Sequence, residues 1–183
     1  MNEVLQNLIK QDKDFAESKF KSKVENTFVQ IKLAIVTCKI EKIDHFVNDE
    51  TYEKIKQKVE TDKENNRIQI YDELNVSNVE IINIEELNDR FIITVKVHSK
   101  ALEYYIDREN RKYLSGNNYS RTERDTIIEY TKMKNAQSYK VVRKCPTCGA
   151  VVDVNANGQC SYCHTIFNLE KYDWVITKME IWF

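Results

Sequence analysis

Glycine and proline are scarce in this sequence, and it has no long hydrophobic run. The 183 residues contain three glycines and one proline, so we expect no flexible linker between separate domains. No apolar run approaches the ~20 residues that a membrane-spanning helix needs. The first residues lack the basic leader and unbroken apolar core of a signal peptide. These absences predict a cytoplasmic protein with one sizeable domain and room for a small appendage.

An excess of positive charge is also missing. Lys and Arg number 28 against 29 Asp and Glu, which gives a formal net charge of −1. Proteins that hold nucleic acid through its phosphates carry a basic face, so the even balance of charge argues against nucleic-acid binding. The chain also contains no G-x-S-x-G, P-loop or H-E-x-x-H motif, and it has three histidines in all. The enzyme classes that those motifs mark are therefore disfavoured.

Cysteine, by contrast, is concentrated near the C-terminus. Four of the five cysteines form two C-x-x-C pairs with 11 residues between the pairs: Cys145, Cys148, Cys160 and Cys163. Two such pairs supply the four thiolates of a tetrahedral Zn²⁺ site, and Gly149 permits a tight turn after the first pair. Four thiolates leave no open coordination position, so the predicted zinc is structural. The fifth cysteine, Cys38, lies in an apolar helical stretch, where we expect a buried thiol.

Haem attachment, iron–sulfur ligation and disulfide formation are alternative uses of these cysteines. The segment CSYCH, which ends in His164, also has the spacing of a c-type haem attachment. Haem leaves the first cysteine pair without a role and requires export, so zinc is preferred and His164 is treated as a bystander. Iron–sulfur ligation is the main alternative metal centre, and a reducing compartment disfavours a disulfide. We predict one Zn²⁺ in a ribbon over residues 143–169, which has no Lys or Arg between its first and last cysteine.

Hydrophobic periodicity predicts helices in the first part of the chain. Apolar residues at helical spacing form one stripe, which consists of Phe20, Val24, Phe28, Ile31 and Ile35, with Val4, Leu8 and Phe15 extending it toward the N-terminus. A second helix is expected to begin at Asn48 or Asp49, because either residue can cap it. Its expected buried face contains Tyr52, Ile55 and Val59.

Further along the chain the period changes to two, which is typical of strands. We expect strands at residues 76–84, 91–97, 101–107, 124–133 and 174–183, with turns at 88–89 and 114–118. Helices followed by an antiparallel meander indicate an α+β fold, in which N-terminal helices pack on a curved, cone-like sheet. The predicted domains are an α+β unit over 1–142 and 170–183, and the zinc-ribbon insertion over 143–169 before the last strand.

The segments Arg143–Cys163 and Tyr172–Lys178 together resemble bacterial zinc-ribbon members of the Tim44-like family. This resemblance implies a helix-plus-curved-sheet domain of the nuclear transport factor two-like (cystatin-like) superfamily. It also implies a non-enzymatic role in membrane-associated protein transport or lipid-surface binding. A protein, peptide or lipid partner is expected at the curved sheet or in an apolar pocket beneath it. Peripheral membrane contact and a homodimer formed through the sheet are further expectations.

Two alternatives to a binding protein stay open, an enzyme and a nucleic-acid-binding zinc-ribbon protein. The superfamily includes enzymes with an Asp–His pair inside the cone, and the candidates here are His98 and Asp107, expected on adjacent strands. His98 lies opposite the most apolar strand face, beside Lys96, which indicates solvent exposure and argues against catalysis. Trp182 and Phe183 are expected to contact the concave face of the sheet or a partner.

Overall fold

The computed structural model of the protein describes residues 2–134, 143–144, 151–152, 162 and 174–180. Within this part of the chain, helices come first and an antiparallel sheet follows, which confirms the predicted α+β class. The helices are α1 (Asn2–Gln11), α2 (Glu17–Thr37) and α3 (Asp49–Glu64), with a 3₁₀ turn, η1, at Ile40–Lys42. None of the described helices is long and apolar enough to cross a membrane.

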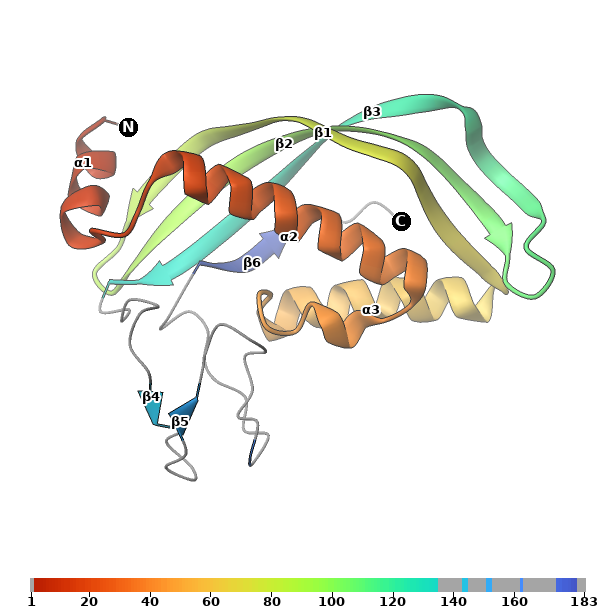
Figure 1. The fold of residues 1–183 in the computed structure, drawn as a ribbon, viewed down its shortest axis with the longest axis horizontal. Coiled ribbons are helices and arrows are strands. Elements are labelled where there is room, and N and C mark those ends of the chain that lie inside the picture. The colour runs from red at the N-terminus through yellow and green to blue at the C-terminus, as the bar shows by residue number, and fades with distance from the viewer. Residues whose placement is uncertain (1, 135–142, 145–150, 153–161, 163–173, 181–183) are drawn as a thin grey trace.

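The main sheet is open and has four strands in the order β1-β2-β3-β6, each antiparallel to its neighbours. Its members are β1 (Arg67–Glu86), β2 (Arg90–Asp107), β3 (Tyr113–Met133) and β6 (Val175–Met179). The three long strands arch over α2, while α3 lies beneath one end of the arch (Figure 1). A separate two-stranded ladder pairs β4 (Arg143–Lys144) with β5 (Val151–Val152).

Helix boundaries follow local sequence signals. The side chain of Asn48 caps α3 as predicted, because its Oδ1 accepts a hydrogen bond from Thr51 N at 2.9 Å. Helix α2 ends at Thr37, and its C-cap residue, Cys38, adopts the left-handed conformation with φ 54°. The expected stripe on α2 is buried throughout. Leu8 is fully buried as well, but it belongs to α1, so residues 12–16 break what was expected to be a continuous stripe.

Several of the predicted strand boundaries are wrong. Strand β1 begins at Arg67, well before residue 76, and the expected strands at 91–97 and 101–107 are one continuous strand, β2. The expected turn at 114–118 lies inside β3, and the chain turns at 108–112 instead. There the Asp107 carboxylate accepts hydrogen bonds at 2.9 Å from the backbone N–H groups of Glu109 and Asn110. The predicted hairpin turn at 88–89 is confirmed by a 2.8 Å bond from Leu87 N to Arg90 O.

The core lies between α2 and the inner face of the arch. Phe28 and Ile31 of α2 belong to the same buried cluster as Ile93 and Val95 of β2. Each such side chain contributes roughly 1.5–3 kcal/mol by leaving water. The apolar inner face is therefore covered by the protein's own helix.

Strand β6 closes one edge of the sheet. It pairs with the second half of β3, and its other side is held by the segment before α3. Asn48 N donates to Ile176 O and Ile176 N donates to Phe46 O, both at 2.9 Å. Trp174, just before β6, packs against Phe20 with ring centroids 5.2 Å apart. These contacts tie the C-terminal strand to both α2 and α3.

Candidate functional site

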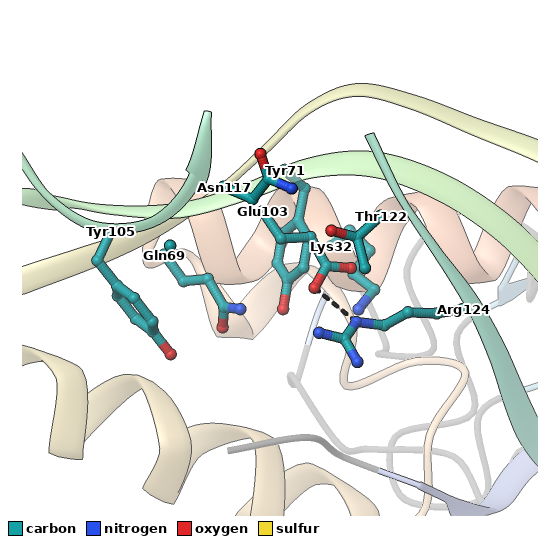
Figure 2. Close-up of a pocket in the computed structure, with 9 residues that line it drawn as sticks. Lys32, Gln69, Tyr71, Glu103, Tyr105, Asn117, Thr122 and Arg124 are labelled. Carbon is teal, nitrogen blue, oxygen red and sulfur yellow. Dashed lines mark hydrogen bonds and ion pairs between the residues drawn. The ribbon is translucent and has the colours of Figure 1, made fainter. Parts of the chain in front are cut away.

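A cavity of about 320 Å³ lies between α2 and the end of the sheet that is joined by the turn at 108–112. This volume is at the lower end of the range for small-molecule sites. We call it the polar pocket, and Figure 2 shows most of its lining: Lys32, Gln69, Tyr71, Glu103, Tyr105, Gly116, Asn117, Thr122 and Arg124. One residue comes from α2 and the others come from β1, β2 and β3.

Strand register places four of these side chains on one face. In the β1–β2 ladder, Gln69 is opposite Tyr105 and Tyr71 is opposite Glu103. Residues two apart in a strand, and residues directly opposite in an antiparallel pair, point to the same side of the sheet. The alternate residues Ile68 and Ile70 are consequently on the other side, where they join a small apolar cluster. The polar face of this ladder forms the roof of the pocket (Figure 2).

An irregularity in β3 makes room for the pocket. The β2–β3 register passes from Ala101↔Thr122 to Glu103↔Asn117, so two steps along β2 correspond to five along β3 and three β3 residues are extra. A bulge bends its strand and locally interrupts the ladder. Asn117 stabilises this bulge, since its Oδ1 accepts a hydrogen bond from Ser120 N at 2.9 Å.

Gly116 is required by the same irregularity. Its φ of +103° lies in a backbone region that residues other than glycine rarely adopt. A Cβ at this position would lie 2.6 Å from Glu103 O and 2.6 Å from Tyr104 Cα, which are backbone atoms that cannot swing aside. The close approach of β3 to β2 at the pocket wall therefore depends on glycine.

Two cations and one carboxylate set the charge of the pocket. Arg124 Nε donates to Glu103 Oε2 at 2.6 Å, and the Glu103 side chain is only 12% exposed. The amino group of Lys32 lies over the rings of Tyr71 and Phe28, 4.1 and 5.3 Å from their centroids. Among the described residues, no hydrogen bond or ion pair reaches that amino group. The pocket thus holds one paired and one unpaired cation.

Burial changes the protonation chemistry of the pocket. Desolvation lowers the pKa of Lys32 to about 8; Glu103 opposes this effect, whereas the positive charges of Arg124 and Lys58 add to it. Desolvation also raises the pKa of the Tyr71 phenol, and Glu103 adds to that increase. Tyr71 is consequently a neutral hydrogen-bonding group, while Lys32 can lose its charge at mildly alkaline pH.

Gln69 is a buried polar side chain with an unsatisfied atom. It is 9% exposed, and its Oε1 has no hydrogen-bond partner. Buried polar groups are almost always hydrogen-bonded, and an unsatisfied one costs about 1–3 kcal/mol. The amide ends beside Tyr71 at the pocket (Figure 2). A buried amide oxygen without a partner calls for a physical explanation, and a hydrogen-bond donor brought by a ligand is one such explanation.

A buried ion cluster supports one wall of the pocket. Asp62 of α3 accepts from Lys58 Nζ and from Arg67 Nε, each at 2.8 Å. The Arg67 guanidinium in turn lies 4.2 Å from the centre of the Tyr105 ring. Sequence analysis missed this cluster, although one signal was available: Asp62 falls on the helical stripe that Ile55 and Val59 define, where a charged residue is unexpected.

The proposed Asp–His pair is not formed. His98 and Asp107 lie on the same strand, nine positions apart, so the expectation of adjacent strands was wrong and they are ~30 Å apart. His98 is 31% exposed, and its Nδ1 lies 2.5 Å from Asp125 Oδ1 on the outer face, opposite buried Val97. Asp107 instead caps the turn at 108–112. His98 is therefore a member of a cross-strand side-chain pair at the surface.

The predicted zinc ligands lie outside the described residues, as do His164, Trp182 and Phe183. What the structure describes is the ladder around the first pair of cysteines, in which Arg143 pairs with Val152 and Lys144 with Val151. In the described part of the chain, no three His, Cys, Asp or Glu side chains are grouped so as to hold a metal ion. The remaining cysteine, Cys38, is partly buried, with its Sγ 3.8 Å from Arg108 Nη1.

Comparison with known proteins identifies a family. The family model of the Tim44-like domain matches residues 1–143, well over half of the chain. One matching solved structure is described as "Crystal structure of intermembrane space region of chloroplast protein ARC6". It is 13% identical, with a TM-score of 0.40, over 87% of this chain and 94% of that chain. No curated protein matches this chain.

Proposed function

We propose, from the premise that the chain belongs to the Tim44-like domain family, that it is a non-enzymatic binding or scaffold protein. In this proposal the polar pocket and the adjoining sheet receive part of a protein partner, a peptide or a lipid. The observation that carries the proposal is the polar pocket, a cavity of about 320 Å³. It combines a cation that has no ion pair with an amide oxygen that has no hydrogen bond among the described residues. Such groups at a preformed cavity favour binding of a ligand that pairs with them.

The chemistry of the described residues favours binding over catalysis. His98 and Asp107 are too far apart to act together, and His98 does not line the polar pocket. The polar pocket is lined by no histidine, cysteine or serine, and its carboxylate, Glu103, is held by Arg124. General acid–base and nucleophilic mechanisms also use Lys, Tyr and Thr, so the preference for binding rests on the separated His98–Asp107 pair and the paired Glu103.

A crosslinking experiment tests the binding function. A photoreactive amino acid replaces Thr122 at the pocket wall in three full-length chains: the wild type, Lys32→Met and the control Lys96→Met. Lys96 is on the outer face, where its Nζ lies 3.4 Å from Glu80 Oε2. We expect a defined adduct, identified by mass spectrometry after irradiation in the source cells, in the wild type and in Lys96→Met. Its yield should fall in Lys32→Met. No adduct, or the same adduct yield in all three chains, refutes the proposal.

The proposal includes one structural Zn²⁺ held by the two C-x-x-C pairs, Cys145, Cys148, Cys160 and Cys163. Two described features support it. A two-stranded ladder flanks the first pair in sequence, as in the hairpins that carry zinc knuckles. Strands β3 and β6 are also neighbours, so the segment between them begins and ends at one edge of the sheet. This arrangement suits an insertion in the α+β domain.

Metal analysis tests the zinc site. We expect one zinc per chain in the purified wild type and loss of that zinc in Cys148→Ser, whereas the distant Cys38→Ser keeps it. Iron in place of zinc, or a zinc content unchanged in Cys148→Ser, contradicts this part of the proposal.

The proposal also includes a cytoplasmic location with peripheral membrane contact, and a homodimer formed through the sheet. Analytical ultracentrifugation tests the dimer, and a monomer at all concentrations excludes it.

A further inference from the structure

The pocket of the proposed function has a chemistry that selects among ligands. We infer that the polar pocket binds a carboxylate group that carries an N–H donor beside it, as in an acidic residue of a peptide or an N-acylated acidic amino acid. This inference rests on the proposed function and names the ligand class for the same site. The argument comes from the charge, the unsatisfied amide and the size of the pocket.

Charge indicates a monoanion. Lys32 and Arg124 contribute two positive charges and Glu103 one negative charge, which leaves a net charge of +1. Glu103 occupies only the Nε of Arg124 (Figure 2), which leaves the two terminal guanidinium nitrogens of this pocket-lining residue as further donors. Arg and Lys donors on two sides of one space suit a carboxylate, which accepts through two oxygens. A phosphate group with −1.5 to −2 charges would leave an excess of negative charge next to Glu103.

The uncharged lining indicates a donor next to the carboxylate. Gln69 Oε1 has no partner, and it is an acceptor, so the group that it lacks is a donor. The terminal torsion of a glutamine side chain is broad, so the amide can turn to present its oxygen to an N–H group in the cavity. A peptide N–H adjacent to an acidic side chain supplies such a donor. A simple fatty acid or an inorganic anion supplies none.

Size and polarity exclude a lipid tail. A cavity of about 320 Å³ has the volume of roughly ten water molecules, which suits one side chain with its flanking amides. The apolar inner face of the sheet is covered by Phe28 and Ile31 of α2. An acyl chain attached to an anionic group in the polar pocket therefore has no apolar surface to occupy along the arch.

The lowered pKa of Lys32, about 8, adds a pH dependence. The groups that face Lys32 are Glu103 and Arg124 on the sheet, Tyr71 on β1 and Lys58 on α3. Burial raises the pKa of Tyr71, so this phenol stays neutral at neutral and mildly alkaline pH. The amino group of Lys32 is thus the cation whose charge is lost as the pH rises through about 8. We expect the affinity for a carboxylate to fall over the same interval.

A titration with small probes tests the inference on the full chain. The probes are N-acetyl-glutamate N-methylamide, the matching glutamine compound, sodium butyrate and inorganic phosphate, and binding is followed by NMR chemical shifts. We expect the glutamate probe to bind roughly tenfold or more tightly than the glutamine probe, because the latter lacks the charge-assisted bonds. Butyrate has the carboxylate but no N–H donor. If butyrate binds more weakly than the glutamate probe, the N–H donor contributes to binding; equal binding of the two overturns the proposed role of the donor.

Variants place the probe in the pocket. Lys32→Met and Arg124→Gln should each weaken the glutamate probe roughly tenfold or more, and Gln69→Leu should remove its advantage over butyrate. Lys96→Met on the outer face is the matched control and should bind as the wild type does. The wild-type affinity should fall between pH 7 and pH 9, on either side of the pKa of about 8, and the affinity of Lys32→Met should not. Urea midpoints of each variant confirm that it is folded.

The outcomes separate the inference from the proposed function. Phosphate binding as tightly as the glutamate probe, or an unchanged affinity in both Lys32→Met and Arg124→Gln, overturns the carboxylate assignment. If the probes fail to bind while the Thr122 crosslink persists and depends on Lys32, the inference is wrong and the proposed function stands. If the probes bind but no crosslink forms in cells, the pocket recognises carboxylates but the proposed binding partner is absent.

Discussion

The buried ion cluster of α3 allows a sharp test of how this fold is stabilised. Asp62 is 7% exposed and accepts hydrogen bonds from Lys58 and Arg67, while Lys58 is 2% exposed. The substitution Asp62→Asn keeps the shape of the side chain and removes its charge. It leaves the amino group of Lys58 buried without a counter-charge, because Asp62 is the only anion paired with it among the described residues.

The expected loss of stability in Asp62→Asn follows from the burial of the ion pair. Removing one partner of a buried ion pair costs about 3–5 kcal/mol, since the remaining charge is desolvated and uncompensated. That cost is a large fraction of the ~5–15 kcal/mol by which a domain is stable. Lys58→Met should cost less than Asp62→Asn, because Asp62 keeps Arg67 as its counter-charge at 2.8 Å. The double variant Lys58→Met/Asp62→Leu should recover much of the loss, because it leaves no unpaired buried charge apart from Arg67, which is 34% exposed.

Equilibrium urea unfolding followed by circular dichroism measures these changes. The control is Glu50→Gln, which removes the partner of Lys54 in the same helix and at the same four-residue spacing. That pair is 2.6 Å apart, but its side chains are 51% and 70% exposed, so we expect no measurable change in the urea midpoint. A loss below about 1 kcal/mol in Asp62→Asn, or equal losses in Asp62→Asn and Glu50→Gln, would show that burial does not control the strength of this pair.

Three other predictions concern the pocket and the outer face. Gly116→Ala should lower the free energy of unfolding by about 1–3 kcal/mol through backbone strain, because the added Cβ would lie 2.6 Å from Glu103 O. An unchanged urea midpoint would contradict this close approach. The pKa of Lys32 is about 8 in the folded chain against 10.5 ordinarily, so the unfolded chain binds more protons between these values and stability should rise with pH there. Lys23, whose pKa is lowered to about 7, contributes a rise of its own over this range. The stability of Lys32→Met should therefore rise less with pH than that of the wild type in urea titrations, and a pH profile parallel to the wild type would exclude burial of the Lys32 charge. His98→Gln, which breaks the pair with Asp125, should leave the Thr122 crosslink unchanged, and its loss would reopen a functional role for that pair.

Local sequence signals predicted α2, α3 and one hairpin correctly, but not the break between α1 and α2. The stripe of α2 and the Asn48 cap of α3 depend on residues within one or two helical turns. The turn after Leu87 depends on adjacent residues as well. Such short-range patterns predict the same local structure in any fold that buries the apolar face of the helix. The order of helices before an antiparallel meander followed from them.

Strand length and pairing could not be predicted in the same way. The long strands carry bulges, such as the register shift between Asp72 and Asn75. Bulges interrupt the alternation of apolar and polar residues from which a strand is predicted. A polar stretch such as residues 114–118 looks like a turn in sequence, yet it lies in β3 because its backbone pairs with β2. The same limit explains the misplaced pair of His98 and Asp107, which were assigned to two strands.

The sequence by itself determined the class of the fold and the cysteine pattern that predicts a zinc ribbon, because helix periodicity and C-x-x-C spacing are local properties. Only the tertiary structure decided where a ligand can bind. Gln69 and Glu103 meet through strand register, Lys32 reaches them from α2, and the extra residues of β3 open the space between. The spacing of these residues along the chain does not predict that they lie together, because their proximity depends on how three strands and a helix pack around one another.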